Sequence, residues 1–142
     1  MQTFLPYPSF ERSLRCLDNQ RLGKQRVEAM QILNCNQGLM SAWRNHPAVL
    51  MWREHPAALT EYYNACLAEW ERRGYRNIKL GRLTTSRRGS QRPSWLGSRK
   101  FHASHRSNLL RKKPEWYLQF GWKEPDNLPY FWPVTLAGLP RD

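Results

Sequence analysis

The sequence predicts an all-α protein with three principal helices, a long basic loop and an aromatic C-terminal tail. Three stretches place apolar residues at helical spacing behind residues that cap helices, and strands and helices do not alternate. The chain of 142 residues is about one domain long, so we expect a single domain over residues 1–142. Seven Trp, six Tyr and five Phe residues supply a packed core, which excludes a disordered chain.

The N-terminal third begins with an extended segment, because two prolines in the first eight residues disfavour helix there. Ser9 is expected to cap a short helix that reaches Leu17. A longer helix starts at Asp18 or the following residue and runs to about Cys35. Gly38 lies just beyond its end, as is common for helix C-termini.

Two His-Pro pairs, His46-Pro47 and His55-Pro56, have the form of helix starts with proline at the first helical position. The second pair opens a helix that Gly74 closes. We expect both histidines to be structural turn or cap residues.

The rest of the chain holds one more helix, from about Ser98 to Lys112, which Pro114 stops. Before it, residues 75–97 contain glycines, serines and arginines without periodicity and predict a long basic loop. After it, residues 116–140 are rich in aromatic residues and prolines and are expected to wrap over the helices.

The charge is strongly positive and unevenly distributed. Lys and Arg total 23 against 11 Asp and Glu, a net charge of +12, and the stretch from Arg72 to Lys113 has no acidic residue. A small basic domain of this kind usually binds a polyanion, and nucleic acid is the expected partner. The alternative is a basic surface that serves solubility, or a ribosome-type basic protein.

The cysteines and the apolar runs bear on the cellular compartment of the protein. Cys16, Cys35 and Cys66 are odd in number and widely spaced, which favours structural thiols in a reducing cytoplasm. No Cys and His residues have zinc-ligand spacing, so no metal site is expected. The apolar runs are too short for a transmembrane helix, and the first residues do not resemble a signal peptide.

The long helix after Asp18 has one polar face that could carry chemistry. At about 100° per residue, one face collects Leu22, Ala29, Met30 and Leu33, and the other Gln20, Arg21, Lys24, Gln25, Glu28 and Gln31. A single carboxylate among cations stays ionised, and Glu28 could stabilise a developing cation or move a proton. The alternative is a solvated face with a Lys24–Glu28 pair. Arg26 falls on the apolar side. We expect its guanidinium either to pair with a buried carboxylate or to extend to the edge of the helix.

Lys24, Gln25 and Gln31 of this polar face are candidate DNA contacts, and the basic segment and the tail supply further ones. Cationic and histidine side chains could bind phosphate or a base at Arg87, Arg88, Arg92, Arg99, Lys100, His102, His105 and Arg106. Trp116 and Tyr117 begin a run of aromatic rings that could stack on bases. The alternative for these two rings is packing in the core.

Three motifs in this order carry a family resemblance: LDNQRL at 17–22 followed by Glu28, AEWERRGY at 68–75 followed by NIK at 77–79, and PEWY at 114–117 followed by Phe120-Gly121. In these motifs the chain resembles the small pyrimidine-dimer DNA glycosylases of the phage endonuclease V type. The run from Arg21 to Glu28 is similar to a bacterial and phage branch of that superfamily.

The resemblance implies an all-α monomer without a cofactor that flips a nucleotide out of double-stranded DNA. In the family the α-amino group of the first residue attacks the deoxyribose C1′, an imine forms, and β-elimination nicks the strand. The catalytic glutamate maps onto Glu28 and the amine onto Met1, while Arg21 takes the place of a histidine. Val27 and Gln31 stand where the family has arginines.

Three functions follow from these observations. The leading hypothesis is a DNA glycosylase, with or without AP-lyase activity, that excises a damaged or modified pyrimidine. The second is a DNA-binding module that keeps the scaffold without catalysis. The third is a different base-modifying enzyme on the same scaffold.

Overall fold

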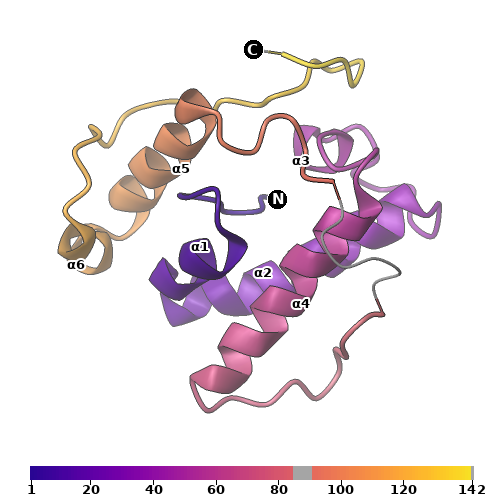
Figure 1. The fold of residues 1–142 in the computed structure, drawn as a ribbon, viewed down its shortest axis with the longest axis horizontal. Helices are drawn as coiled ribbons and strands as arrows, with labels where there is room; N and C mark the ends of the chain where they lie inside the picture. The colour runs from indigo at the N-terminus through magenta and orange to yellow at the C-terminus, as the bar shows by residue number, and fades with distance from the viewer. Residues whose placement is uncertain (85–90, 142) are drawn as a thin grey trace.

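The computed structural model describes residues 1–84 and 91–141, and every regular element within them is helical. Figure 1 shows the arrangement of α1 (Phe10–Cys16), α2 (Asn19–Asn36), α3 (Pro47–Leu50), α4 (Pro56–Arg72), α5 (Arg99–Lys112) and α6 (Pro114–Tyr117). A 3₁₀ turn, η1 (Leu118–Phe120), follows α6. The described residues contain no strand, only an isolated bridge between Val134 and Pro140, which confirms the all-α class.

The helix ends follow the expected signals. The Ser9 side chain accepts a hydrogen bond from the Arg12 N–H, and the His46 ring accepts one from the Ala48 N–H. Gly38 and Gly74 follow α2 and α4 with φ angles of +78° and +92°, a region that favours glycine. His55 is the N-cap residue of α4, as expected, but its side chain makes no capping hydrogen bond.

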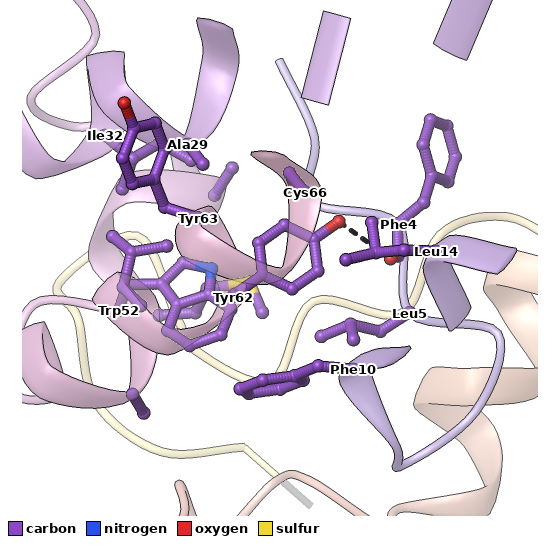
Figure 2. Close-up of a cluster of buried hydrophobic side chains, with 14 of the residues drawn as sticks. Phe4, Leu5, Phe10, Leu14, Ala29, Ile32, Trp52, Tyr62, Tyr63 and Cys66 are labelled. Carbon is purple, nitrogen blue, oxygen red and sulfur yellow. Dashed lines mark hydrogen bonds between the residues drawn. The ribbon is translucent and has the colours of Figure 1, made fainter. Parts of the chain in front are cut away.

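The core lies between α2, α4 and α1 (Figure 2). Tyr62 of α4 is fully buried, with the ring of Phe10 edge-on at 5.5 Å and that of Trp52 at 6.0 Å. Gly23 lets α2 approach α4 closely, because a Cβ there would meet the Trp70 ring at 3.3 Å. These contacts make the α2–α4 pair the rigid support for everything on the polar side of α2.

Arg26 pairs with no carboxylate among the described residues, which was one of the two positions expected for it. Its guanidinium lies over the Trp70 ring, 4.3 Å from the ring centroid, and donates to the Asn77 side-chain oxygen at 2.9 Å. A guanidinium is only weakly hydrated and stacks well on aromatic faces, so this position on the apolar side is tolerated.

The N-terminal segment runs between α5 on one side and the α2–α4 pair on the other (Figure 1). Residues 2–6 are buried although they belong to no helix. The tail beyond α6 passes α5 and ends near α3, so it wraps over the helices as expected.

The three cysteines are buried free thiols. Burial raises the pKa of Cys16 to about 12 and raises that of Cys66 as well, so these thiols are poor nucleophiles. No helix in the described ranges has the length and apolar character that crossing a membrane requires.

Candidate active site

Glu28 is joined directly to the start of the chain. Its Oε2 accepts a hydrogen bond of 2.8 Å from the main-chain N–H of Gln2, across 26 positions of sequence. Met1 and Glu28 line the same hollow in the surface. The fold therefore places the first residue of the chain beside the one carboxylate of the polar face of α2.

Gln25 anchors the same segment one helical turn earlier. Its Oε1 accepts from the Phe4 N–H at 2.7 Å, and its Nε2 donates to the Gln2 carbonyl at 2.9 Å. The Tyr62 hydroxyl lies 2.6 Å from Gln25 Oε1 and 2.9 Å from the Phe4 carbonyl, which completes a buried network. The segment is thus held along α2 by main-chain groups, which fixes the direction in which Met1 points.

Two histidines of α5 hold the segment from the other side. His105 Nδ1 accepts from the Leu5 N–H at 2.8 Å, and His102 Nδ1 donates to the Leu5 carbonyl at 2.7 Å. Burial, assisted by the positive charge of Arg106, lowers the pKa of His105 to about 3 and also lowers that of His102. Both rings are therefore neutral at physiological pH. His105 Nδ1 must be neutral to accept from Leu5, and His102 Nε2 must be neutral to accept from the Gly97 N–H at 2.8 Å.

The hollow has a volume of about 300 Å³ and receives side chains from the N-terminus, α2, α5 and the tail. Its lining consists of Met1, Gln2, Phe4, Gln20, Arg21, Lys24, Glu28, Lys112 and Tyr130. Two larger hollows, of about 510 and 720 Å³, contain neither Glu28 nor the N-terminus.

Cations from two helices meet at this hollow. Partial burial lowers the pKa of Lys112, and Arg21 and Lys24 lower it further by like-charge repulsion. A ligand with negative charge would relieve this repulsion, so the hollow suits a phosphate group of a polyanion.

Arg21 is held in place by an ion pair with Asp18. Its Nη1 lies 3.2 Å from Asp18 Oδ1, and the Tyr117 hydroxyl donates to the same oxygen at 2.6 Å. Burial alone would raise the pKa of Asp18, but the hydrogen bonds from Tyr117 and Arg21 outweigh it and lower the pKa. An ionised Asp18 therefore orients Arg21 at the rim of the hollow.

Aromatic rings continue from the hollow to the surface. Tyr130 of the lining is tilted against Trp132, which packs edge-on with His46, and His46 packs edge-on with Trp43. Trp43 is half exposed and has a φ of +70°, a strained conformation for a bulky residue. The row begins at Tyr130 in the lining of the hollow, and aromatic rings beside cations are a combination suited to nucleobases.

The predicted site residues separate into two groups. Met1, Arg21, Lys24 and Glu28 come together at the hollow, while Arg92, Arg99 and Lys100 are exposed elsewhere and Gln31 is half-buried on α2. Lys100 is the second residue of α5 and Lys112 is its last, about 18 Å apart along the helix axis. Arg87 and Arg88 lie outside the described residues.

Other predicted DNA contacts point into the protein instead. Gln25, His102, His105 and Tyr117 are buried and engaged in internal hydrogen bonds, so their side chains do not face the solvent. Arg106 pairs with Glu124 and donates to the Pro6 carbonyl. The Trp116 ring is half-buried, with its N–H on the Cys16 carbonyl, which agrees with the packing alternative for the aromatic run.

Helix geometry accounts for the burial of Gln25. It lies about 40° around the helix axis from both Arg21 and Ala29, at the border between the polar and the apolar face of α2. Its amide is tolerated there because the extended N-terminal segment offers both a donor and an acceptor.

Sequence reasoning missed Gln2, Lys112 and Tyr130 at the hollow. Lys112 belongs to the acid-free basic stretch, so charge was its available signal. Gln2 and Tyr130 had no local signal, because their place in the site depends on contacts across the whole chain.

The fold and the hollow define a small helical protein with a cationic site around one carboxylate, the kind of site an enzyme acting on nucleic acid requires. A family model described as pyrimidine dimer DNA glycosylase matches residues 1–81, more than half of the chain. The chain therefore belongs to the pyrimidine dimer DNA glycosylase family, and its class of activity is that of a DNA glycosylase. No curated protein and no solved structure matched it. The matched region includes Met1 and Glu28 but neither α5 nor the tail.

Proposed function

We propose that the protein is a DNA glycosylase with AP-lyase activity in which the α-amino group of Met1 is the nucleophile and Glu28 manages the protons. The observation that carries the proposal is the hydrogen bond from the Gln2 N–H to Glu28. It holds the residue next to the amine against the carboxylate, so nucleophile and proton acceptor share one hollow.

The chemistry needs no group beyond these two and water. The amine nitrogen bonds to C1′ of a deoxyribose while the bond from C1′ to the base breaks, and the departing base takes the electron pair. Glu28 accepts the proton that the amine loses. Glu28 returns that proton to O4′ as the C1′–O4′ bond opens to give an imine. The carboxylate then takes a C2′ proton while the C3′–O bond breaks and the 3′ phosphate leaves by β-elimination.

The cations around the hollow would bind the phosphates that flank the reacting sugar. Arg21, Lys24 and Lys112 are at the hollow, and Arg99 and Lys100 lie about one α5 length away. A contact surface of that length suits double-stranded DNA bound by a monomer. Such a substrate would place the protein in the cytoplasm.

The amine mechanism is tested by trapping. A duplex with a cyclobutane thymine dimer, or with an abasic site, is incubated with the protein and sodium borohydride, which reduces an imine to a stable bond. We expect a covalent protein–DNA adduct attached at Met1, located by peptide mass spectrometry. Acetylating the α-amino group should abolish the adduct while leaving DNA affinity intact.

Two other outcomes support the alternatives. Tight binding without an adduct and without base release would favour a DNA-binding module. Base release without an adduct would favour a glycosylase or another base-modifying enzyme in which Glu28 activates water.

A further inference from the structure

One tryptophan is exposed in a strained backbone conformation. Of the seven tryptophans, all of them within the described residues, Trp43 alone is exposed, with 52% of its surface open to solvent. Its φ of +70° is the only positive φ outside glycine in the same part of the chain. A bulky side chain in this region costs stability, and glycine or asparagine would fit better. The fold therefore does not account for a tryptophan here, and strain of this kind is often kept for function.

The loop between α2 and α3 holds Trp43 firmly. The His46 N–H donates to the Trp43 carbonyl at 2.7 Å, and the Cys35 thiol donates to the Ala42 carbonyl at 3.1 Å. The His46 ring meets the Trp43 ring in a T-shaped contact, with the ring centroids 6.1 Å apart. No other ring packs against Trp43 within the described ranges, so much of the indole surface is open for a ligand.

The His46 ring links Trp43 to the amine of Met1. Trp132 packs edge-on against His46 and is tilted against Tyr130, which lines the hollow together with Met1. Burial lowers the pKa of His46, and the positive charge of the Met1 amine lowers it further, so the amine acts on this ring directly. Trp43 therefore lies one ring beyond the surroundings of the proposed nucleophile.

Two arginines accompany the exposed ring. Arg44 and Arg53 are both exposed, and the Arg53 guanidinium donates to the Arg44 carbonyl at 3.0 Å. Neither guanidinium pairs with a carboxylate in the described part of the chain, so both are open to phosphate. An aromatic ring beside such cations is typical of sites for single-stranded nucleic acid. A base inside a duplex has both faces covered by its neighbours, so only an unpaired base can stack on Trp43.

We propose that Trp43 stacks on an unpaired nucleobase next to the reacting nucleotide, with Arg44 and Arg53 on phosphates of the same strand; this rests on the proposed glycosylase function. The preferred substrate is then DNA in which the reacting nucleotide borders a short single-stranded segment, ahead of a duplex that is paired on both sides. No bond forms or breaks at this subsite, which adds affinity only.

The test measures binding without reaction. A duplex carries a tetrahydrofuran abasic-site analogue, which the amine cannot attack because its C1′ has neither a base nor an aldehyde. It is paired on both sides, or left unpaired for roughly three nucleotides on the 5′ side or on the 3′ side, a segment within the site sizes of single-strand binding proteins. Fluorescence anisotropy at one fixed salt concentration gives the affinities.

We expect the wild-type protein to bind one of the two partly unpaired forms about tenfold more tightly than the paired form, as for one stacked base. Only one form should gain, because the row of rings leaves the hollow in a single direction. A 2-aminopurine in that unpaired segment should lose fluorescence on binding, since stacking on indole quenches it.

Three variants separate stacking from a structural role. Trp43→Asn removes the ring but suits the backbone, so it should abolish both the preference and the quenching while the melting temperature stays equal or rises. Trp43→Tyr keeps a ring and should retain most of the preference. Leu39→Asn removes another exposed apolar side chain from the same loop and should change neither quantity.

Other outcomes overturn the inference. Equal affinity of the wild-type protein for all three forms, or a preference that survives in Trp43→Asn, would show that Trp43 contacts no base. The binding results do not depend on catalysis, so a missing borohydride adduct would reject the proposed mechanism without deciding this subsite. Failure to bind any of the three forms would reject the proposed function and the subsite with it.

Discussion

At the scale of single residues, Glu28 combines two tasks that the fold brings together. Its Oε2 holds the Gln2 N–H, and the same carboxylate stands among the cations of the hollow. Val27, next to it, is 43% exposed and carries no charge, so the arginine that the family has there is missing from this site. Lys112 from α5 supplies positive charge to the hollow from a different element.

Glu28→Gln should separate these two tasks. The glutamine oxygen can still accept from the Gln2 N–H, so the N-terminal segment stays in place, but the side chain can no longer take a proton. We expect the rate of adduct formation to fall at least about 10²-fold, while DNA affinity is unchanged or higher because a negative charge near phosphate is lost. Glu115→Gln, an exposed control on α6, should alter neither quantity. Undiminished turnover of Glu28→Gln would show that Glu28 is a solvated helix residue.

At the scale of elements, the site depends on how α2 and α5 hold the N-terminal segment between them. Gln25 binds it from α2, and His102 and His105 bind it from α5. Both histidines make these contacts as neutral rings, and both have pKa values below the ordinary value of 6.5. The hydrogen bonds between α5 and the N-terminal segment should therefore weaken in acid.

The free energy of unfolding should fall as the pH drops below about 6.5. The unfolded chain binds a proton at the ordinary histidine pKa, whereas the folded protein resists protonation of His105 down to a pKa of about 3. Between these values each such histidine costs about 1.4 kcal/mol of stability per pH unit. Urea unfolding at pH 7.5, 6.5 and 5.5 measures this slope above the range where carboxylates titrate.

His105→Gln is the matched variant for this measurement. It keeps an acceptor for the Leu5 N–H but cannot titrate, so it should reduce the pH dependence while lowering stability at pH 7.5; His102, His46 and His55, whose pKa values are also lowered, account for the remainder. A slope in this variant equal to that of the wild type would assign the acid sensitivity to other groups.

At the scale of the whole molecule, the net charge of +12 governs the electrostatic attraction between the protein and DNA. Exposed cations lie at the hollow and at the far end of α5, which spreads the positive surface over the length of a helix. Non-specific attraction over such a surface comes from release of counterions, and it is independent of sequence.

Duplex binding should therefore weaken steeply with salt. If about six phosphates are neutralised, the logarithm of the association constant should fall against the logarithm of salt concentration with a slope of roughly −5. Fluorescence anisotropy between 50 and 300 mM salt, roughly the range in which counterion release is measured, gives the slope. Lys24→Gln, which removes one cation at the hollow, should reduce its magnitude by about one. A slope near zero for the wild type would contradict binding to the DNA backbone.

The sequence by itself determined the helices, their caps, the basic character and the candidacy of Glu28, because these depend on local periodicity, turn chemistry and charge. It also carried the motifs that place the chain in its family. The tertiary structure alone decided which polar residues reach the surface and which lie inside. Gln25, His102 and His105 are polar by composition, yet they are buried because an extended segment up to 100 positions away supplies their hydrogen-bond partners. For the same reason the approach of Gln2 to Glu28, on which the proposed chemistry depends, follows from packing across the chain.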